Sequence, residues 1–126
     1  MLIDTRSTRP QAHFPINVMG RDITLSDELR EFVQRRLTTA LGRFAAKLRD
    51  VDVWFEDVNG PRRGVDIRCR VVLRLKSGRH AIATAHAANA FAAIARAADR
   101  AGATLAKRSE RLWMARQGRT LRRGLG

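Results

Sequence analysis

Cationic and apolar residues alternate along residues 65–76, and these cations are the side chains best placed for binding chemistry. Because side chains on a β-strand point alternately to opposite faces, the pattern predicts a half-buried strand with one basic face. That face carries Arg68, Arg70, Arg74 and Lys76. At about 3.3 Å per residue the row is roughly 26 Å long, which suits contact with an extended polyanion. The alternative is a solvated strand face whose charges are balanced by neighbouring Asp52 and Glu56.

The positive charge of the chain is concentrated in two segments. The formal net charge is +13. Residues 62–79 contain seven Lys or Arg and one Asp, and residues 96–126 contain nine Lys or Arg and two acidic residues. The rest of the chain is therefore neutral. Concentrated positive charge of this kind indicates a nucleic-acid partner, with an acidic membrane or protein surface as the alternative.

The second basic segment includes a predicted helix over residues 89–112, with Asn89 as its N-cap. At 100° per residue its large apolar side chains, from Phe91 to Leu112, fall in one arc, so Phe91 is expected in the core. Basic residues form a ridge on the opposite side, and these are Arg96, Arg100, Lys107 and Arg111. The ridge is either an RNA contact or the ordinary polar side of an amphipathic helix.

The remaining elements place these two basic surfaces. Ser26 is a good N-cap for a helix that ends near Gly42, and Ser77-Gly78 predicts a tight turn between two strands. Small residues at Ala81, Ala83 and Ala85 would let a helix approach the sheet closely. The predicted strands are 15–19, 51–56, 65–76 and 79–86, and the predicted helices are 26–41 and 89–112.

The order of these elements predicts the fold class. Strand, helix, three strands and helix give a two-layer α+β domain, with a four-stranded mixed sheet and two helices packed on one face. We expect residues 1–14 to be a flexible leader, 15–112 the domain and 113–126 a basic flexible tail. The chain has no run of 18 apolar residues, so no membrane segment or membrane partner is expected.

Enzymatic chemistry is not indicated. The sequence contains no Gly-rich phosphate loop, no metal-ligand spacing and no nucleophile beside a base, so we expect no enzyme, cofactor, metal or small-molecule substrate. His80 and His86 lie about 20 Å apart along a strand, too far to share a metal. Cys69 is the lone cysteine and faces inward, which favours a reducing cytoplasm. Trp54 on the outer face either stacks on a base or covers neighbouring side chains.

Three stretches resemble a known family. They are Ile16-Asn17-Val18-Met19-Gly20, then Leu25-Ser26-Asp27-Glu28-Leu29-Arg30-Glu31-Phe32-Val33, and Ala83-Thr84-Ala85 leading to Phe91-Ala92-Ala93-Ile94 and Lys107-Arg108. Together they resemble the ribosome hibernation-promoting factors, also described as ribosome-associated inhibitors or sigma-factor modulation proteins. The resemblance covers about Ile16 to Arg111, and it is to the short form, without a C-terminal dimerising domain.

The resemblance implies a function. Proteins of this family bind the small ribosomal subunit in the channel of messenger and transfer RNA, contact ribosomal RNA with basic residues of the sheet and last helix, and block translation in stationary phase or stress. Its basic cluster matches Arg100, Lys107, Arg108 and Arg111 here. By contrast, Asn89, Phe91 and Ala95 stand where the family usually has an acid, a Tyr and an acid.

Two other functions stay open beside a ribosome-binding inhibitor. The differences from the family pattern are also compatible with a diverged regulatory module that binds an acidic protein surface. A general RNA binder is the other possibility, and competition by bulk transfer RNA would distinguish it. The sequence leaves open whether Trp113, Met114 and Leu121 form a homo-oligomer contact.

Overall fold

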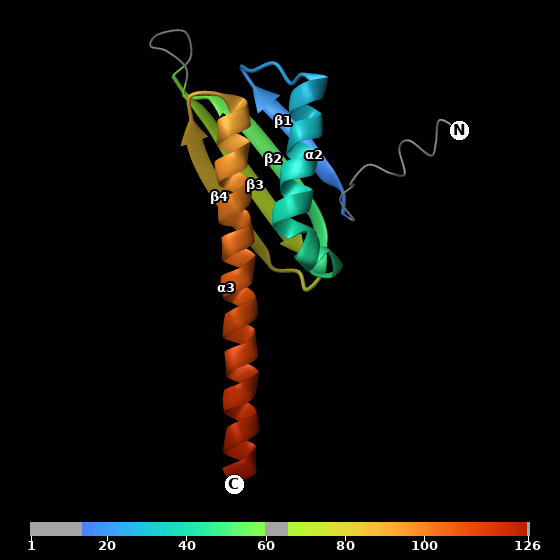
Figure 1. Ribbon diagram of the computed structural model, residues 1–126, viewed down its shortest axis with the longest axis vertical. Helices are drawn as coiled ribbons and strands as arrows, with labels where there is room; N and C mark the ends of the chain where they lie inside the picture. The colour runs from blue at the N-terminus through green and yellow to red at the C-terminus, as the bar shows by residue number, and fades with distance from the viewer. Residues whose placement is uncertain (1–13, 60–65, 126) are drawn as a thin grey trace, which may run out of the picture.

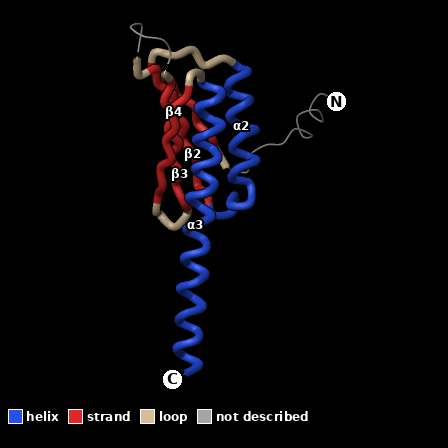
Figure 2. Tube along the Cα trace, turned by 60° about the vertical axis from the view of Figure 1, so that its left-hand side comes forward, coloured by secondary structure: helices blue, strands red, loops and turns tan. Residues whose placement is uncertain are grey.

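Within the described residues, four strands form one sheet and two helices cover one of its faces (Figures 1 and 2). The computed structural model describes the backbone of residues 14–59 and 66–125, and the side chains of residues 14–59 and 66–108. The predicted two-layer α+β fold is confirmed. The elements are β1 (Ile16–Arg21), α2 (Asp27–Leu41), the 3₁₀-helix η1 (Gly42–Lys47), β2 (Leu48–Asp57), β3 (Ile67–Leu75), β4 (His80–Ala87) and α3 (Ala90–Leu125).

The strands lie side by side in the order β1-β2-β3-β4. β1 runs parallel to β2 because the chain crosses between them through α2, whereas β2–β3 and β3–β4 are antiparallel. The two edges of the sheet are therefore β1 and β4. Parallel neighbours need such a crossover, and antiparallel neighbours can be joined by a short turn like the one at Gly78, whose φ of +93° favours glycine.

Helix α2 begins as its sequence predicts. The Ser26 hydroxyl oxygen accepts a hydrogen bond from the Leu29 backbone N–H at 3.1 Å. Leu29, Val33 and Leu37 are buried at helical spacing and form the stripe that faces the sheet. At its other end the helix continues into η1, because Gly42 keeps a right-handed conformation, with φ of −55°.

Small side chains allow α3 to pack closely on β4 and α2. Ala81, Ala83, Ala85 and Ala87 of β4 are buried, as the sequence predicts for the first three. Gly102 allows a similarly close approach to α2, since a Cβ atom there would lie 3.0 Å from the carbonyl oxygen of Ala40, which is tighter than an ordinary contact. The helix begins after Asn89, whose side-chain oxygen accepts from the Ala92 N–H at 2.8 Å.

Phe91 corrects one prediction about α3. It is 40% exposed and packs edge-on against Phe32 of α2, with ring centroids 5.2 Å apart. The helical-wheel argument placed it in the core because it treated the arc as uniformly covered. The buried residues of the first turn of α3 are Ala90, Ala93 and Ile94, so Phe91 lies at the margin of the buried arc, beside α2.

The ends of the domain also differ from the prediction. Helix α3 continues to Leu125 instead of ending at residue 112, and its last turns project beyond the sheet (Figure 1). Residues 113–125 contain no proline and several good helix formers, so nothing stops the helix at 112. The flexibility of residues 113–126 stays a prediction. Despite the length of α3, no helix in the described ranges is apolar enough to cross a membrane.

The predicted leader lies outside the described residues except for Phe14. This residue is only 5% exposed and belongs to the hydrophobic core, whereas the bounds of the domain stay a prediction. Sequence reasoning missed it because Phe14 precedes the apolar alternation of β1.

Candidate nucleic-acid interface

The face of the sheet that the helices leave open carries most of the predicted site. On β3, Ile67, Cys69, Val71 and Leu73 are buried, so the alternating side chains point to the open side and the predicted parity is confirmed. We call this side the outer face. Its residues are Asn17, Met19 and Arg21 of β1, Asp50, Asp52, Trp54 and Glu56 of β2, Arg68, Arg70, Val72 and Arg74 of β3, and His80, Ile82, Thr84 and His86 of β4.

Lys76 is not part of this row. β3 ends at Leu75, and Lys76 is the first residue of the turn to β4. The prediction of four cations on one strand is therefore wrong at its last member, because the turn begins earlier than the alternation suggests. Lys76 is exposed at the end of the sheet.

Two of the three remaining arginines are neutralised by the protein's own carboxylates. Arg68 forms an ion pair with Glu56, its cross-strand neighbour on β2. Arg74 Nη1 lies 2.9 Å from Asp50 Oδ1 and 2.7 Å from Asp52 Oδ2. These contacts raise the pKa of Arg74, chiefly through the hydrogen bond to Asp50. Both arginines would have to exchange a carboxylate for a phosphate in order to bind RNA.

The hydrogen bonds and ion pairs around Arg74, which we call the Arg74 network, also shift the pKa of Asp52. Partial burial by itself raises the pKa of Asp52, but it is outweighed by hydrogen bonds from Asn17 and Arg74 and by the charge of Arg74. The result is a pKa below the ordinary value for an aspartate. Asn17 on β1 donates to Asp52 at 3.0 Å, so the network spans three strands.

Arg70 differs from its two neighbours. It is exposed, and it forms no hydrogen bond or ion pair with any residue in the described part of the chain. Its cross-strand neighbours are uncharged: Trp54 on β2 and Thr84 on β4. Trp54 is 46% exposed. We call Arg70, Trp54 and Thr84 the Arg70 centre, a free cation beside an exposed aromatic ring on a flat sheet.

Two predicted residues of α3 border the same face. Arg100 Nη1 donates to the carbonyl oxygen of Thr84 at 2.5 Å, and Arg96 Nη1 donates to the carbonyl oxygen of His86 at 2.8 Å. These bonds satisfy acceptors on the open edge of β4, where an unpaired strand would otherwise attract another chain. Because carbonyls are neutral, both guanidinium groups keep their charge available to a second partner.

The cross-strand register joins these arginines into one band. Thr84 pairs with Arg70, and His86 pairs with Arg68. Arg100 therefore lies beyond the β4 edge in line with Arg70, and Arg96 lies there in line with Arg68. The sequence placed these helix arginines on a ridge opposite the core, but it could not show that the ridge turns toward the outer face.

The other predicted contacts lie farther along α3. Lys107 is exposed and Arg108 is partly buried. The side chain of Arg111 lies outside the described residues. RNA contact by the predicted set stays a prediction at every position: Arg68, Arg70, Arg74, Lys76, Arg96, Arg100, Lys107, Arg108 and Arg111, with Trp54 as a stacking residue.

Sequence reasoning missed several arginines near this face, among them Arg49 and Arg79. Arg49 lies at an irregularity between Leu48 and Asp50, where the β2–β3 register shifts, so simple alternation does not place it. Its Nε is 3.6 Å from Asp50 Oδ2. Arg79 precedes β4 and is exposed. Both belong to a hollow on the outer face whose lining also includes Arg70 and Arg74.

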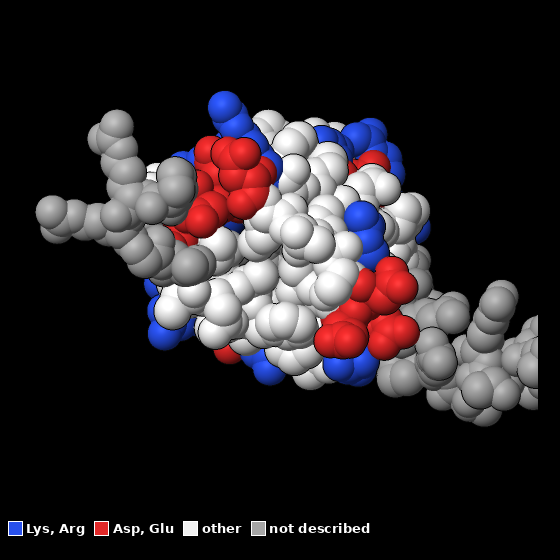
Figure 3. Space-filling view, turned by 90° about the horizontal axis from the view of Figure 1, so that it is seen from above, with Lys and Arg blue, Asp and Glu red and all other residues white. Residues whose placement is uncertain are grey.

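Positive charge does not cover the whole molecule. At the end where α2 and α3 begin, acidic side chains gather in two groups on either side of a largely uncharged surface (Figure 3). Asp27 and Glu28 in the first turn of α2 contribute acidic charge to this end, where they interact favourably with the positive end of the helix dipole. This end of the molecule therefore carries acidic as well as basic side chains.

No group of three His, Cys, Asp or Glu residues within the described ranges is placed to hold a metal ion. Burial raises the pKa of Cys69 to about 12, so its thiol is protonated and a poor nucleophile. His86 Nδ1 lies 3.6 Å from Asp66 Oδ2, a contact at the sheet surface.

Comparison with solved structures gives relatives of the same fold. The crystal structure of the Thermus thermophilus Protein Y N-terminal domain is similar with a TM-score of 0.58 and 23% identity, covering 70% of this chain and 90% of that one. A ribosomal subunit interface protein from Coxiella burnetii gives a TM-score of 0.62 and 15% identity, covering 75% and 97%. No curated protein sequence matches the chain.

The sequence itself matches one protein family over residues 16–113, well over half of the chain. That range begins with β1 and includes all four strands, α2 and the sheet-packed part of α3. The match agrees with the resemblance carried by the β1, α2 and β4–α3 stretches. The chain therefore belongs to the family described as sigma 54 modulation protein / S30EA ribosomal protein.

Proposed function

We propose that this protein is a ribosome-binding translation inhibitor that occupies the messenger and transfer RNA channel of the small subunit. The observation that carries the proposal is the Arg70 centre, where an arginine with no carboxylate partner in the described ranges lies beside an exposed tryptophan on the outer face. Membership in a family whose description includes a ribosomal protein supports the choice of partner. The protein would act in the cytoplasm, where ribosomes work.

Inhibition would be steric and electrostatic. Arginines at the Arg70 centre and the β4 edge would replace counterions along ribosomal RNA, while the domain fills space that substrates need. Each neutralised phosphate lowers the slope of log K against log salt by about 0.7 to 0.9. Contacts from Arg70, Arg96 and Arg100 alone would therefore give a slope of roughly −2 to −3.

The residues of the site would have different roles. Arg70 would bind a phosphate or stack on a base, and Trp54 would offer its ring to an unpaired base. Arg96 and Arg100 would bind backbone phosphates while their bonds to β4 hold them in place. Arg68 and Arg74 would contribute less, because each already has a carboxylate partner.

Co-sedimentation with small ribosomal subunits tests the proposal. Arg70→Glu should weaken binding by about 10- to 100-fold, because a charge-assisted contact is worth about 1.5–3 kcal/mol and the new charge repels phosphate. Arg30→Glu is the matched control, since Arg30 is an exposed arginine on α2 and the charge change is equal. Equal losses in both variants would mean that only net charge matters.

A second arm separates ribosome binding from general RNA binding. Bulk transfer RNA is added as competitor at the same phosphate concentration as the subunits. Specific binding should survive this competition, whereas a general RNA binder should be displaced. Intact ribosome binding by Arg70→Glu would show that the outer face is not the docking surface.

A further inference from the structure

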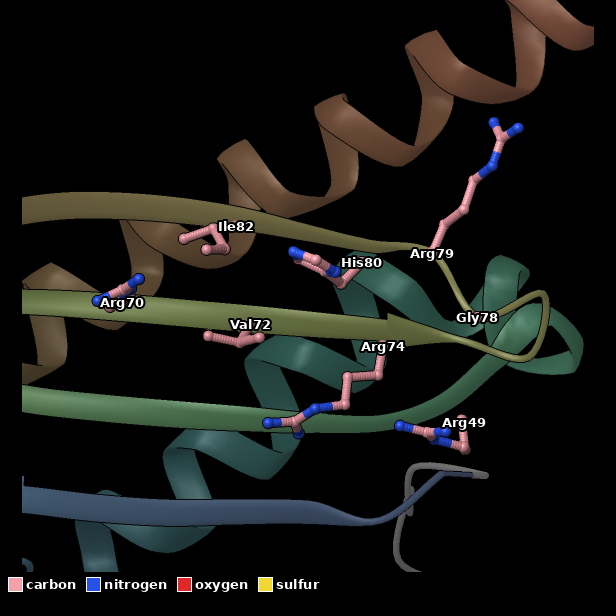
Figure 4. Close-up of a pocket in the computed structure, with 8 residues that line it drawn as sticks. All are labelled: Arg49, Arg70, Val72, Arg74, Gly78, Arg79, His80 and Ile82. Carbon is pink, nitrogen blue, oxygen red and sulfur yellow. The ribbon is translucent and has the colours of Figure 1, made fainter.

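A hollow on the outer face has a composition that the proposed function does not yet explain. Its volume is about 390 Å³, within the range of roughly 300–1,000 Å³ typical of ligand pockets. It lies between the Arg70 centre and the turn that joins β3 to β4 (Figure 4). The lining residues that matter here are Arg49, Arg70, Val72, Arg74, His80 and Ile82.

The floor of the hollow is apolar and narrow. Val72 on β3 and Ile82 on β4 are direct cross-strand neighbours, and Ile82 is 45% exposed. Adjacent strands lie about 4.8 Å apart, so the two side chains make a floor about as wide as one planar ring. An exposed isoleucine on the edge strand of a charged face has no role in the core, and it offers contact area to a flat apolar group.

Cations stand at both ends of this floor. Arg70 and Arg74 are each two residues from Val72, so their Cα atoms lie roughly 13 Å apart along β3. Arg70 has no carboxylate partner in the described part of the chain, and it marks one end. At the other end, Arg74 is held by Asp50 and Asp52, while Arg49 contacts Asp50 only at 3.6 Å.

This difference between Arg49 and Arg74 decides which arginine can bind a ligand. Asp50 already has a closer partner in Arg74, at 2.9 Å, so Arg49 gives up little when it turns to another anion. In Figure 4 the side chains of Arg49 and Arg74 lie at the same end, and Arg79 points away from them. Arg49 and Arg70 are thus the two available cations, on opposite sides of the floor.

We propose that the hollow binds one nucleoside that carries a phosphate on each side, with the base over Val72 and Ile82 and the phosphates at Arg70 and Arg49. Inorganic anions would leave the apolar floor unused, and an uncharged aromatic ligand would leave both arginines unused. An acidic peptide would supply charge without a planar ring between its anionic groups. The inference deepens the proposed function, since an internal nucleotide of an RNA strand has this chemistry.

A free nucleoside 3′,5′-bisphosphate has the same chemistry as an internal RNA nucleotide. Calorimetric titration of the full chain with adenosine 3′,5′-bisphosphate, adenosine 5′-monophosphate, adenosine and pyrophosphate tests whether binding needs both the base and the two phosphates. The bisphosphate should bind about tenfold more tightly than the monophosphate, which corresponds to one additional charge-assisted contact. Pyrophosphate as tight as the bisphosphate would overturn the inference, because the floor would then contribute nothing.

Variants separate the contribution of the apolar floor to affinity from that of the arginines at its ends. Ile82→Ser should weaken the bisphosphate about tenfold and leave pyrophosphate unchanged, because it removes only apolar contact. Arg70→Gln should weaken both ligands, and Arg30→Gln on α2 should weaken neither. Both Ile82 and Arg70 are exposed, so the variants should fold, and amide NMR shifts of unliganded protein would verify this. An Ile82→Ser variant with unchanged bisphosphate affinity would also overturn the inference.

The source of the nucleotide is read from two further measurements. A single-stranded trinucleotide that competes with the bisphosphate, together with loss of ribosome binding in Ile82→Ser, identifies an RNA strand as the occupant. Bisphosphate binding without any binding to ribosomes would keep the hollow as a free-nucleotide site and refute the proposed function. Ribosome binding without bisphosphate binding would support the proposed function and refute the nucleotide site in the hollow.

Discussion

The two faces of the sheet differ in what their residues do. On the inner face, β3 and β4 bury small and branched apolar side chains such as Val71, Leu73 and Ala85 against the helices. On the outer face β3 carries arginines whose carboxylate partners vary from two at Arg74 to none, within the described chain, at Arg70. Charge alone therefore does not define a binding surface; the carboxylates beside each arginine decide which cations are available.

The largest expected effect is on the inner face. Phe55 is fully buried, and Phe55→Ala should lower the free energy of unfolding by about 3–5 kcal/mol because it leaves a cavity. Urea denaturation measures this change. Trp54→Ala on the adjacent outer position is the control, and it should cost far less. Similar losses for both variants would contradict the division of roles between the two faces.

The next effect concerns stacking at the Arg70 centre. Trp54→Ala should weaken RNA binding by about 1–3 kcal/mol if its ring stacks on a base. Trp54→Phe should recover much of the loss, because a smaller aromatic face remains. Fluorescence anisotropy with a single-stranded RNA measures both. A Trp54→Ala variant with wild-type affinity would show that the ring only covers its neighbours.

Removing a carboxylate should sharpen the contrast between paired and free arginines. Glu56→Gln releases Arg68, so RNA affinity should rise, while stability should fall by only about 0–1 kcal/mol, as for an exposed pair. Glu28→Gln at the start of α2 is the control with the same charge change. Equal gains in both variants would show that local pairing does not limit Arg68.

The smallest effect is the pH dependence of the Arg74 network. Burial raises the pKa of Asp52, but bonds from Asn17 and Arg74 outweigh it and hold the pKa below 3.8. A carboxylate with a lowered folded pKa stabilises the protein above its unfolded value, and that contribution is lost as the pH falls through the folded value. Below about pH 4, wild type should therefore lose more stability than Asp52→Asn in urea denaturation. If wild type and Asp52→Asn lost the same stability on acidification, the network would contribute nothing to the stability of the protein.

Much of the fold follows from local patterns in the sequence. The alternation along β3, the Ser26 cap and the alanines of β4 each depend on near neighbours, and the structure agrees with all three. The end of α3 was harder to predict. Residues 113–125 offer no strong stop signal, and the expected tail rested on their charge rather than on any helix-breaking residue.

The candidate site was less predictable, since it depends on contacts between distant residues. Glu56 and Asp52 are recognisable from the sequence as acids near the arginine row. Only the folded structure shows that they form ion pairs with Arg68 and Arg74, and that Arg70 has no carboxylate partner among the described residues. The same holds for Arg100, which reaches the Thr84 carbonyl across the β4 edge. Pairing between strands and helices, unlike periodicity, leaves no signal in a single sequence.

The central claim is that Arg70 contacts a phosphate while Arg68 remains paired with Glu56. Its most direct test is the salt dependence of binding to small ribosomal subunits for wild type, Arg70→Gln and Arg68→Gln. The slope of log K against log salt should become shallower by about 0.7 to 0.9 in Arg70→Gln and change much less in Arg68→Gln. Equal changes in the two variants, or none in Arg70→Gln, would contradict the account.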